Sequence, residues 1–265
     1  MTPRLKHLAS IAFAFSLTAC SSSGDFAVMS PIVQNGEFSA EVRTEPLSLT
    51  VGVPTTIFYR FRENGKVVNI EDRYLMVHAF LASEDLLDVY HTIEIVREED
   101  NSHPITHTFL RAGRYRIFVE LEDPSAEFRH GKHALLIASH DVVVEGQSIP
   151  VEPPVNPAIN GARSTHLEAN NLKTGTASLI VRAEEGGKPI AFFAGMPSIY
   201  VMVGPDLDLI GHGHTHGPAD VESVDEITYQ EVLPKAGNYA LWTELYPSAE
   251  ESFTPLQAFF HFMVE

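Results

Sequence analysis

The sequence predicts an all-β protein built from two tandem immunoglobulin-like antiparallel β-sandwich domains. Short stretches of alternating apolar residues are separated by glycine-containing turns, no sustained helical period is present, and the chain repeats itself once over its 265 residues. Closely spaced strands without helices are typical of antiparallel sandwiches, and each repeat has roughly the 100 residues of an immunoglobulin-like domain. A cupredoxin-like strand order is compatible with the same pattern.

The repeat consists of three pairs of matched segments. The first pair is an alternating strand that ends in a turn-forming dipeptide, Asn64-Gly65 or Gly186-Gly187. The second leads from an apolar strand through an Asp-Leu turn to a histidine at the same offset, and the third shares Ala-Gly-x-Tyr before a strand. The matched pairs are 55–66 with 177–188, 80–91 with 201–212, and 110–121 with 234–245.

A proline-rich stretch separates the two copies. Prolines cannot donate to a sheet ladder and stiffen an extended connector, so this stretch predicts a linker over residues 147–162. We therefore expect one β-sandwich over residues 37–146 and a second over residues 163–265.

The N-terminus predicts export and lipid anchoring. A positively charged start and a short apolar run lead into Leu17-Thr18-Ala19-Cys20, which resembles the lipobox of bacterial lipoproteins. The resemblance implies a signal peptide over residues 1–19, lipidation of Cys20 and a tether over residues 20–36. The apolar run is shorter than the roughly 20 residues needed to span a bilayer. The alternative is an ordinary N-terminal helix with a buried cysteine.

Lipidation of Cys20 would place the protein in the cell envelope, anchored to a membrane by its N-terminus. Ser21, directly after the cysteine, resembles a sorting signal for the outer membrane. We therefore expect the outer membrane, with the domains facing the periplasm or the cell surface.

Charge and cysteine content exclude several functions. The net charge is −17 and becomes −19 when Arg4 and Lys6 are removed with the signal peptide, so nucleic acid is not expected as a partner, whereas cations are attracted. Cys20 is the only cysteine, which excludes disulfides and thiolate metal sites, among them a blue-copper centre.

The strongest local signal is a histidine-rich segment in the second copy, Gly211-His212-Gly213-His214-Thr215-His216-Gly217-Pro218. In an extended segment, His212, His214 and His216 project from one face. Imidazole is a good ligand for copper and zinc, and the glycines allow the backbone to bend so that the rings converge. The alternative is a solvated His-Gly loop that binds metal only incidentally.

The first copy offers two further histidines. His91 stands at the position matched to His212, and His78 lies on the strand that precedes it. Because Val77, Ala79 and Leu81 form the natural core face of that strand, His78 points to the opposite face. It is either a metal ligand or a hydrogen-bonded histidine under a loop.

This arrangement of histidines resembles that of bacterial secreted β-sandwich proteins of the YtkA-like or CopC-like envelope type. These proteins carry a histidine on the strand and His-x-His after the Asp-Leu turn, and are associated with copper or other heavy metals. By position, the first copy matches with His78 and His91 but has Ile93 in place of the second turn histidine. The second copy matches with His212 and His214 but has Ile199 on the strand. This pattern of histidines fits either one composite site between the domains or a single site in the second domain.

Signals for catalysis are weak. The sequence has no Gly-x-Ser-x-Gly elbow and no phosphate-binding glycine loop after a strand. We predict a non-enzymatic envelope lipoprotein that binds copper or zinc for sequestration, delivery or sensing, with an envelope protein partner whose identity the sequence does not specify. The alternative is a structural or protein-interaction lipoprotein whose histidine loop is incidental.

Overall fold

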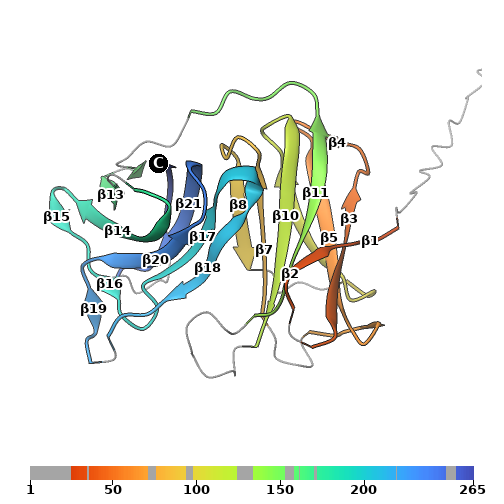
Figure 1. Cartoon of the computed structure of the whole chain (residues 1–265), viewed down its shortest axis with the longest axis horizontal. Coiled ribbons are helices and arrows are strands. Elements are labelled where there is room, and N and C mark those ends of the chain that lie inside the picture. The colour runs from red at the N-terminus through yellow and green to blue at the C-terminus, as the bar shows by residue number, and fades with distance from the viewer. Residues whose placement is uncertain are drawn as a thin grey trace, which may run out of the picture.

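The computed structural model confirms the all-β prediction and shows two β-sandwiches side by side (Figure 1). Among the described residues the one helical element is a short 3-10 turn, η2 (Pro205–Leu207). No described helix is long and apolar enough to cross a membrane. The structure describes residues 25–34, 36–70, 76–93, 98–123, 134–152, 158–160, 162–169, 172–218, 220–248 and 255–265. The predicted signal peptide and Cys20 lie outside them.

The N-terminal sandwich consists of two sheets. The first contains β1 (Ala27–Val28), β3 (Phe38–Glu45), β5 (Pro54–Glu63) and β6 (Lys66–Val67) in that order, with β9 (His103–Thr108) also paired to β5. The second has the order β2 (Ser30–Gln34), β11 (Ala134–Glu145), β10 (Gly113–Glu122), β7 (Met76–Ser83) and β8 (Val89–Ile93). Its ladders are antiparallel except for β4 (Leu49–Thr50), which pairs with β11 in parallel.

The C-terminal sandwich has the same plan. One sheet contains β12 (Ala158–Asn160), β13 (Arg163–Glu168), β14 (Gly175–Glu185) and β15 (Lys188–Pro189), with β20 (Ile227–Leu233) beside β14. The other has the order β18 (Leu209–Thr215), β17 (Ser198–Val203), β21 (Gly237–Leu245) and β22 (Leu256–Val264). A small ribbon joins β16 (Phe192–Phe193) and β19 (Ser223–Val224).

The sequence repeat corresponds to equivalent pairs of strands. Phe80 of β7 is in register with His91 of β8, and Val201 of β17 is in register with His212 of β18. The segment from Asp85 that leads to His91 is a hydrogen-bonded turn followed by β8. His91 is thus a strand residue, like its counterpart His212.

Both connecting segments contain strands that the sequence did not predict. Residues 27–34, expected in the tether, form β1 and β2, which pair with β3 and β11. Residues 158–160, expected in the linker, form β12 and pair with β13. The side chains of β2 are all exposed, so that strand lacks the alternation of apolar residues that would reveal it. Strands of two or three residues are too short to show a period.

The two sandwiches pack sheet against sheet. β7 and β8 face β17 and β18 across the boundary (Figure 1), and an apolar cluster with members from both domains fills the space between them. Phe80 and Phe118 come from the first domain, and Val201 and Trp242 from the second. Apolar surface removed from water in this way stabilises the packing by about 25 cal/mol per Å². The outer face of the β7–β10 sheet is therefore a second buried surface, separate from the core of its own sandwich.

Candidate metal centre

His78 and His91 lie on neighbouring strands of this buried face. Val77 and Ala79 point into the core of the first sandwich, so His78 between them points out of it, as the strand period predicts. Residues of the second domain cover His78, whose exposed fraction is 0 %. His91, on β8, is also buried.

His212 and His214 come from the opposite side of the boundary, on β18. They are two residues apart, in register with Val201 and Ile199 of β17, and point to the same side of the sheet. The His78 ring centroid lies 4.9 Å from that of His212 and 5.5 Å from that of His214. We call His78, His91, His212 and His214 the histidine cluster; it is a composite of both domains.

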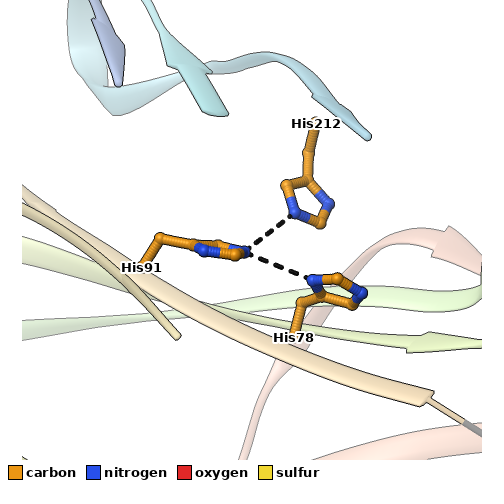
Figure 2. A group of neighbouring side chains, drawn as sticks. All are labelled: His78, His91 and His212. Atoms are coloured by element: carbon orange, nitrogen blue, oxygen red, sulfur yellow. Dashed lines mark hydrogen bonds between the residues drawn. The ribbon is translucent and has the colours of Figure 1, made fainter. Parts of the chain in front are cut away.

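Three ring nitrogens of the histidine cluster converge (Figure 2). The Nε2 of His91 lies 3.2 Å from Nδ1 of His78 and 3.3 Å from Nε2 of His212. A tetrahedral ion with metal–nitrogen bonds of 2.0–2.1 Å needs ligand nitrogens about 3.3–3.4 Å apart. The two measured separations match this spacing, so the residues present fit a zinc or copper ion.

Two glutamates of β10 complete the surroundings. Glu120 contacts Nδ1 of His212, and Oε2 of Glu122 lies 3.5 Å from Nε2 of His78. If Glu120 accepts the Nδ1–H proton of His212, the Nε2 lone pair of that ring faces the cluster, which is the usual role of a carboxylate behind a metal-binding histidine. Among the described residues, two groups have metal-ligand spacing: His78, His91 and His212, and His78, Glu122 and His214.

The sequence analysis missed both glutamates. They alternate with Val119 and Leu121 on a strand whose other face lies in the core. Acidic residues that alternate with apolar ones are typical of a strand with one face in water, so the sequence contains no signal that this face of β10 is covered. Only the packing of the second domain shows what covers them.

Burial keeps the central rings neutral. The pKa of His91 is well below its ordinary value of 6.5, because burial disfavours its charged form and because His212 and His78 repel a second positive charge. The pKa of His212 is also well below 6.5, for the same reason and through repulsion by His78 and His214. Neutral imidazole is the form that a metal ligand requires, so His91 and His212 meet this condition at neutral pH.

Aromatic side chains enclose the cluster. The Phe80 ring stacks on His212 with centroids 4.9 Å apart, and the Trp242 ring lies 4.8 Å from that of His91. Trp242 is the only tryptophan of the chain, and its exposed fraction is 8 %. Its fluorescence therefore reports on this site alone.

His216, the third histidine of the predicted loop, does not join the cluster. Its Nδ1 lies 2.6 Å from the backbone oxygen of Gly195, and neither group of described residues with metal-ligand spacing includes it. β18 ends at Thr215, so the alternation that aligns His212 with His214 does not extend to His216.

A cleft between the domains reaches the cluster from the side. It has a volume of about 510 Å³ and is lined by Val33 and Ile137 of the first domain and by Tyr200, His212 and Glu231 of the second. Tyr200 donates a hydrogen bond to Glu231, and burial raises the pKa of the Glu231 carboxyl. His212 of the histidine cluster lies in the wall of this cleft.

Gly211 is required by the close approach of Glu231. A Cβ at position 211 would lie 2.7 Å from the carboxyl carbon of Glu231 and 3.1 Å from the Tyr200 ring. We expect Gly211→Ala to lower the free energy of unfolding by about 1–3 kcal/mol, the usual cost of overpacking, measured by urea denaturation. Adding Glu231→Ala to this variant should recover part of the lost free energy of unfolding, because it removes the side chain that the new Cβ would contact. Equal stability of Gly211→Ala and wild type would show that this contact does not require a glycine.

Comparison with known proteins gives distant structural similarity only. No family model matches the sequence, and no curated protein matches it. Among solved structures, the native conformation of E. coli alpha-2-macroglobulin is similar over 86% of this chain, with 11% identity and a TM-score of 0.28. A DUF4785 family protein from Legionella pneumophila is similar over 86%, with 9% identity and a TM-score of 0.27. A putative membrane anchored protein from Corynebacterium diphtheriae is similar over 84%, with 12% identity and a TM-score of 0.25.

The chain spans 17% of the length of the macroglobulin, 56% of the Legionella protein and 58% of the Corynebacterium protein.

Proposed function

We propose that this protein binds copper or zinc through the histidine cluster between its two domains. The observation that carries the proposal is the convergence of His78, His91 and His212 from both domains, with nitrogens 3.2 and 3.3 Å apart and a carboxylate behind His212. Three imidazoles without a thiolate favour Cu(II) or Zn(II). The resemblance to YtkA-like and CopC-like envelope proteins supports the same class of ligand.

We further propose a binding role rather than a catalytic one, in an envelope lipoprotein anchored through Cys20 at the outer membrane. The ligands are enclosed by two domains, and the exposed fractions of His78 and His91 are 0 % and 7 %. A catalytic zinc needs a position open to substrate. A buried centre suits sequestration, delivery or sensing of the ion.

Titration of the soluble chain from residue 26 to 265 with Cu(II) tests the proposal. We expect saturable quenching of Trp242 fluorescence, because that ring lies 4.8 Å from the His91 ring, together with calorimetric binding tighter than about micromolar. His212→Ala should weaken binding by more than the roughly 100-fold that loss of an outer-shell contact costs, and Glu120→Gln by about 10–100-fold.

His216→Ala is the matched control, because it removes an imidazole directly after β18 that lies outside the cluster. It should bind Cu(II) like the wild type. Weak binding by the wild-type chain, or equal losses in His216→Ala and His212→Ala, would refute a dedicated site. The interaction-module alternative would then be preferred.

A further inference from the structure

We propose that the centre holds two metal ions bridged by the imidazole of His78. This inference rests on the proposed function, since it specifies how many ions the same site takes. The two groups of described residues with metal-ligand spacing share one member, His78.

The two nitrogens of His78 face different groups. Nδ1 lies 3.2 Å from Nε2 of His91, and Nε2 lies 3.5 Å from the carboxylate of Glu122 (Figure 2 shows one ring nitrogen of His78 pointing toward His91 and the other away from it). An imidazole ring holds its nitrogens on opposite sides, so one ion cannot bind both. Two ions, one at each nitrogen, give all four members of the histidine cluster and Glu122 a place in coordination.

Each ion then has its own ligand set. The first is bound by His78 Nδ1, His91 Nε2 and His212 Nε2, and the second by His78 Nε2, Glu122 and His214. One set is all nitrogen and the other mixes nitrogen and oxygen, so the two ions need not be of the same element.

The charge balance supports two ions. Binding of an ion at each nitrogen of His78 requires the ring to give up its N–H proton, which passes to the buffer. The bridging ring is then an anion. Together with Glu120 and Glu122 it supplies three negative charges beside the four positive charges of two divalent ions.

Stoichiometry and magnetic coupling test the bridge in the full soluble chain. Titration of wild type with Cu(II) should saturate at two equivalents, and the electron paramagnetic resonance signal should integrate to far less than two independent ions, because an imidazole bridge couples their spins. Glu122→Gln and His214→Ala should each bind one equivalent, with a full signal for that single ion. His216→Ala should behave as wild type.

Three results are decisive. Two coupled ions in wild type and one ion in Glu122→Gln support the bridge. Saturation at one equivalent, or two ions with the full signal of independent centres, overturns the bridge but leaves the proposed single-ion function standing. Absence of tight binding overturns both.

Discussion

Zn(II) is expected to hold the two domains together after the chain between them is cut. A protease site inserted between Val151 and Glu152 would separate residues 26–151 from residues 152–265, so that the described contacts between the halves are those of the domain boundary. His78 and His91 then belong to one half, and His212 and His214 to the other. Zn(II) at 100 times its dissociation constant should stabilise the association by about 2.7 kcal/mol, or about 100-fold in affinity.

The measurement is the dissociation constant of the cut halves with saturating Zn(II) and with a chelator. Apolar contacts such as Phe80, Phe118 and Trp242 should maintain some association without metal. The contribution of Zn(II) is therefore measured by the ratio of the two dissociation constants. Replacing both His212 and His214 by alanine should reduce that ratio to near one, because it removes the second domain's histidines from both groups with metal-ligand spacing, whereas His216→Ala should preserve it. Equal constants with and without Zn(II) in wild type would show that the ion does not bridge the domains.

Acid is expected to destabilise the metal-free protein between about pH 6.5 and pH 5. The pKa values of His91 and His212 are lowered in the fold, so below pH 6.5 the unfolded chain binds protons that the folded chain does not. Stability is therefore fully present above pH 6.5 and falls as the pH decreases. Well below 6.5, each histidine that stays neutral in the fold lowers the free energy of unfolding by about 1.4 kcal/mol per pH unit.

Urea denaturation at several pH values, with chelator present, measures this slope. Glu231 changes the free energy of unfolding with pH in the opposite direction. Its pKa is raised in the fold, so the folded chain binds the proton more tightly and stability falls as the pH rises. A Glu231→Gln background removes that contribution. In this background, replacing both His91 and His212 by glutamine should flatten the slope, and an unchanged slope would assign the acid sensitivity to other groups. Asp88, whose pKa is lowered, acts only at more acidic pH.

The sequence alone was sufficient for the fold class and for most of the candidate ligands. Alternating strands and glycine turns identified two β-sandwiches, because strand period and turn conformation are local properties. The same alternation placed His78 on the face opposite Val77 and Ala79, and it paired His212 with His214. The structure confirms the all-β prediction that rested on these local patterns. The strands β1, β2 and β12 were not predicted, because they are too short or too exposed to show an alternation of apolar residues.

Only the tertiary structure decided that two incomplete copies form one centre. Ile93 and Ile199 stand where each copy lacks a histidine, and the packing of β7 and β8 against β17 and β18 brings His78 and His91 to His212 and His214. It also buries Glu120 beside His212 and leaves His216 outside. No local pattern encodes these contacts, because the two halves of the site are more than a hundred residues apart and their separation is set by how two sheet faces fit.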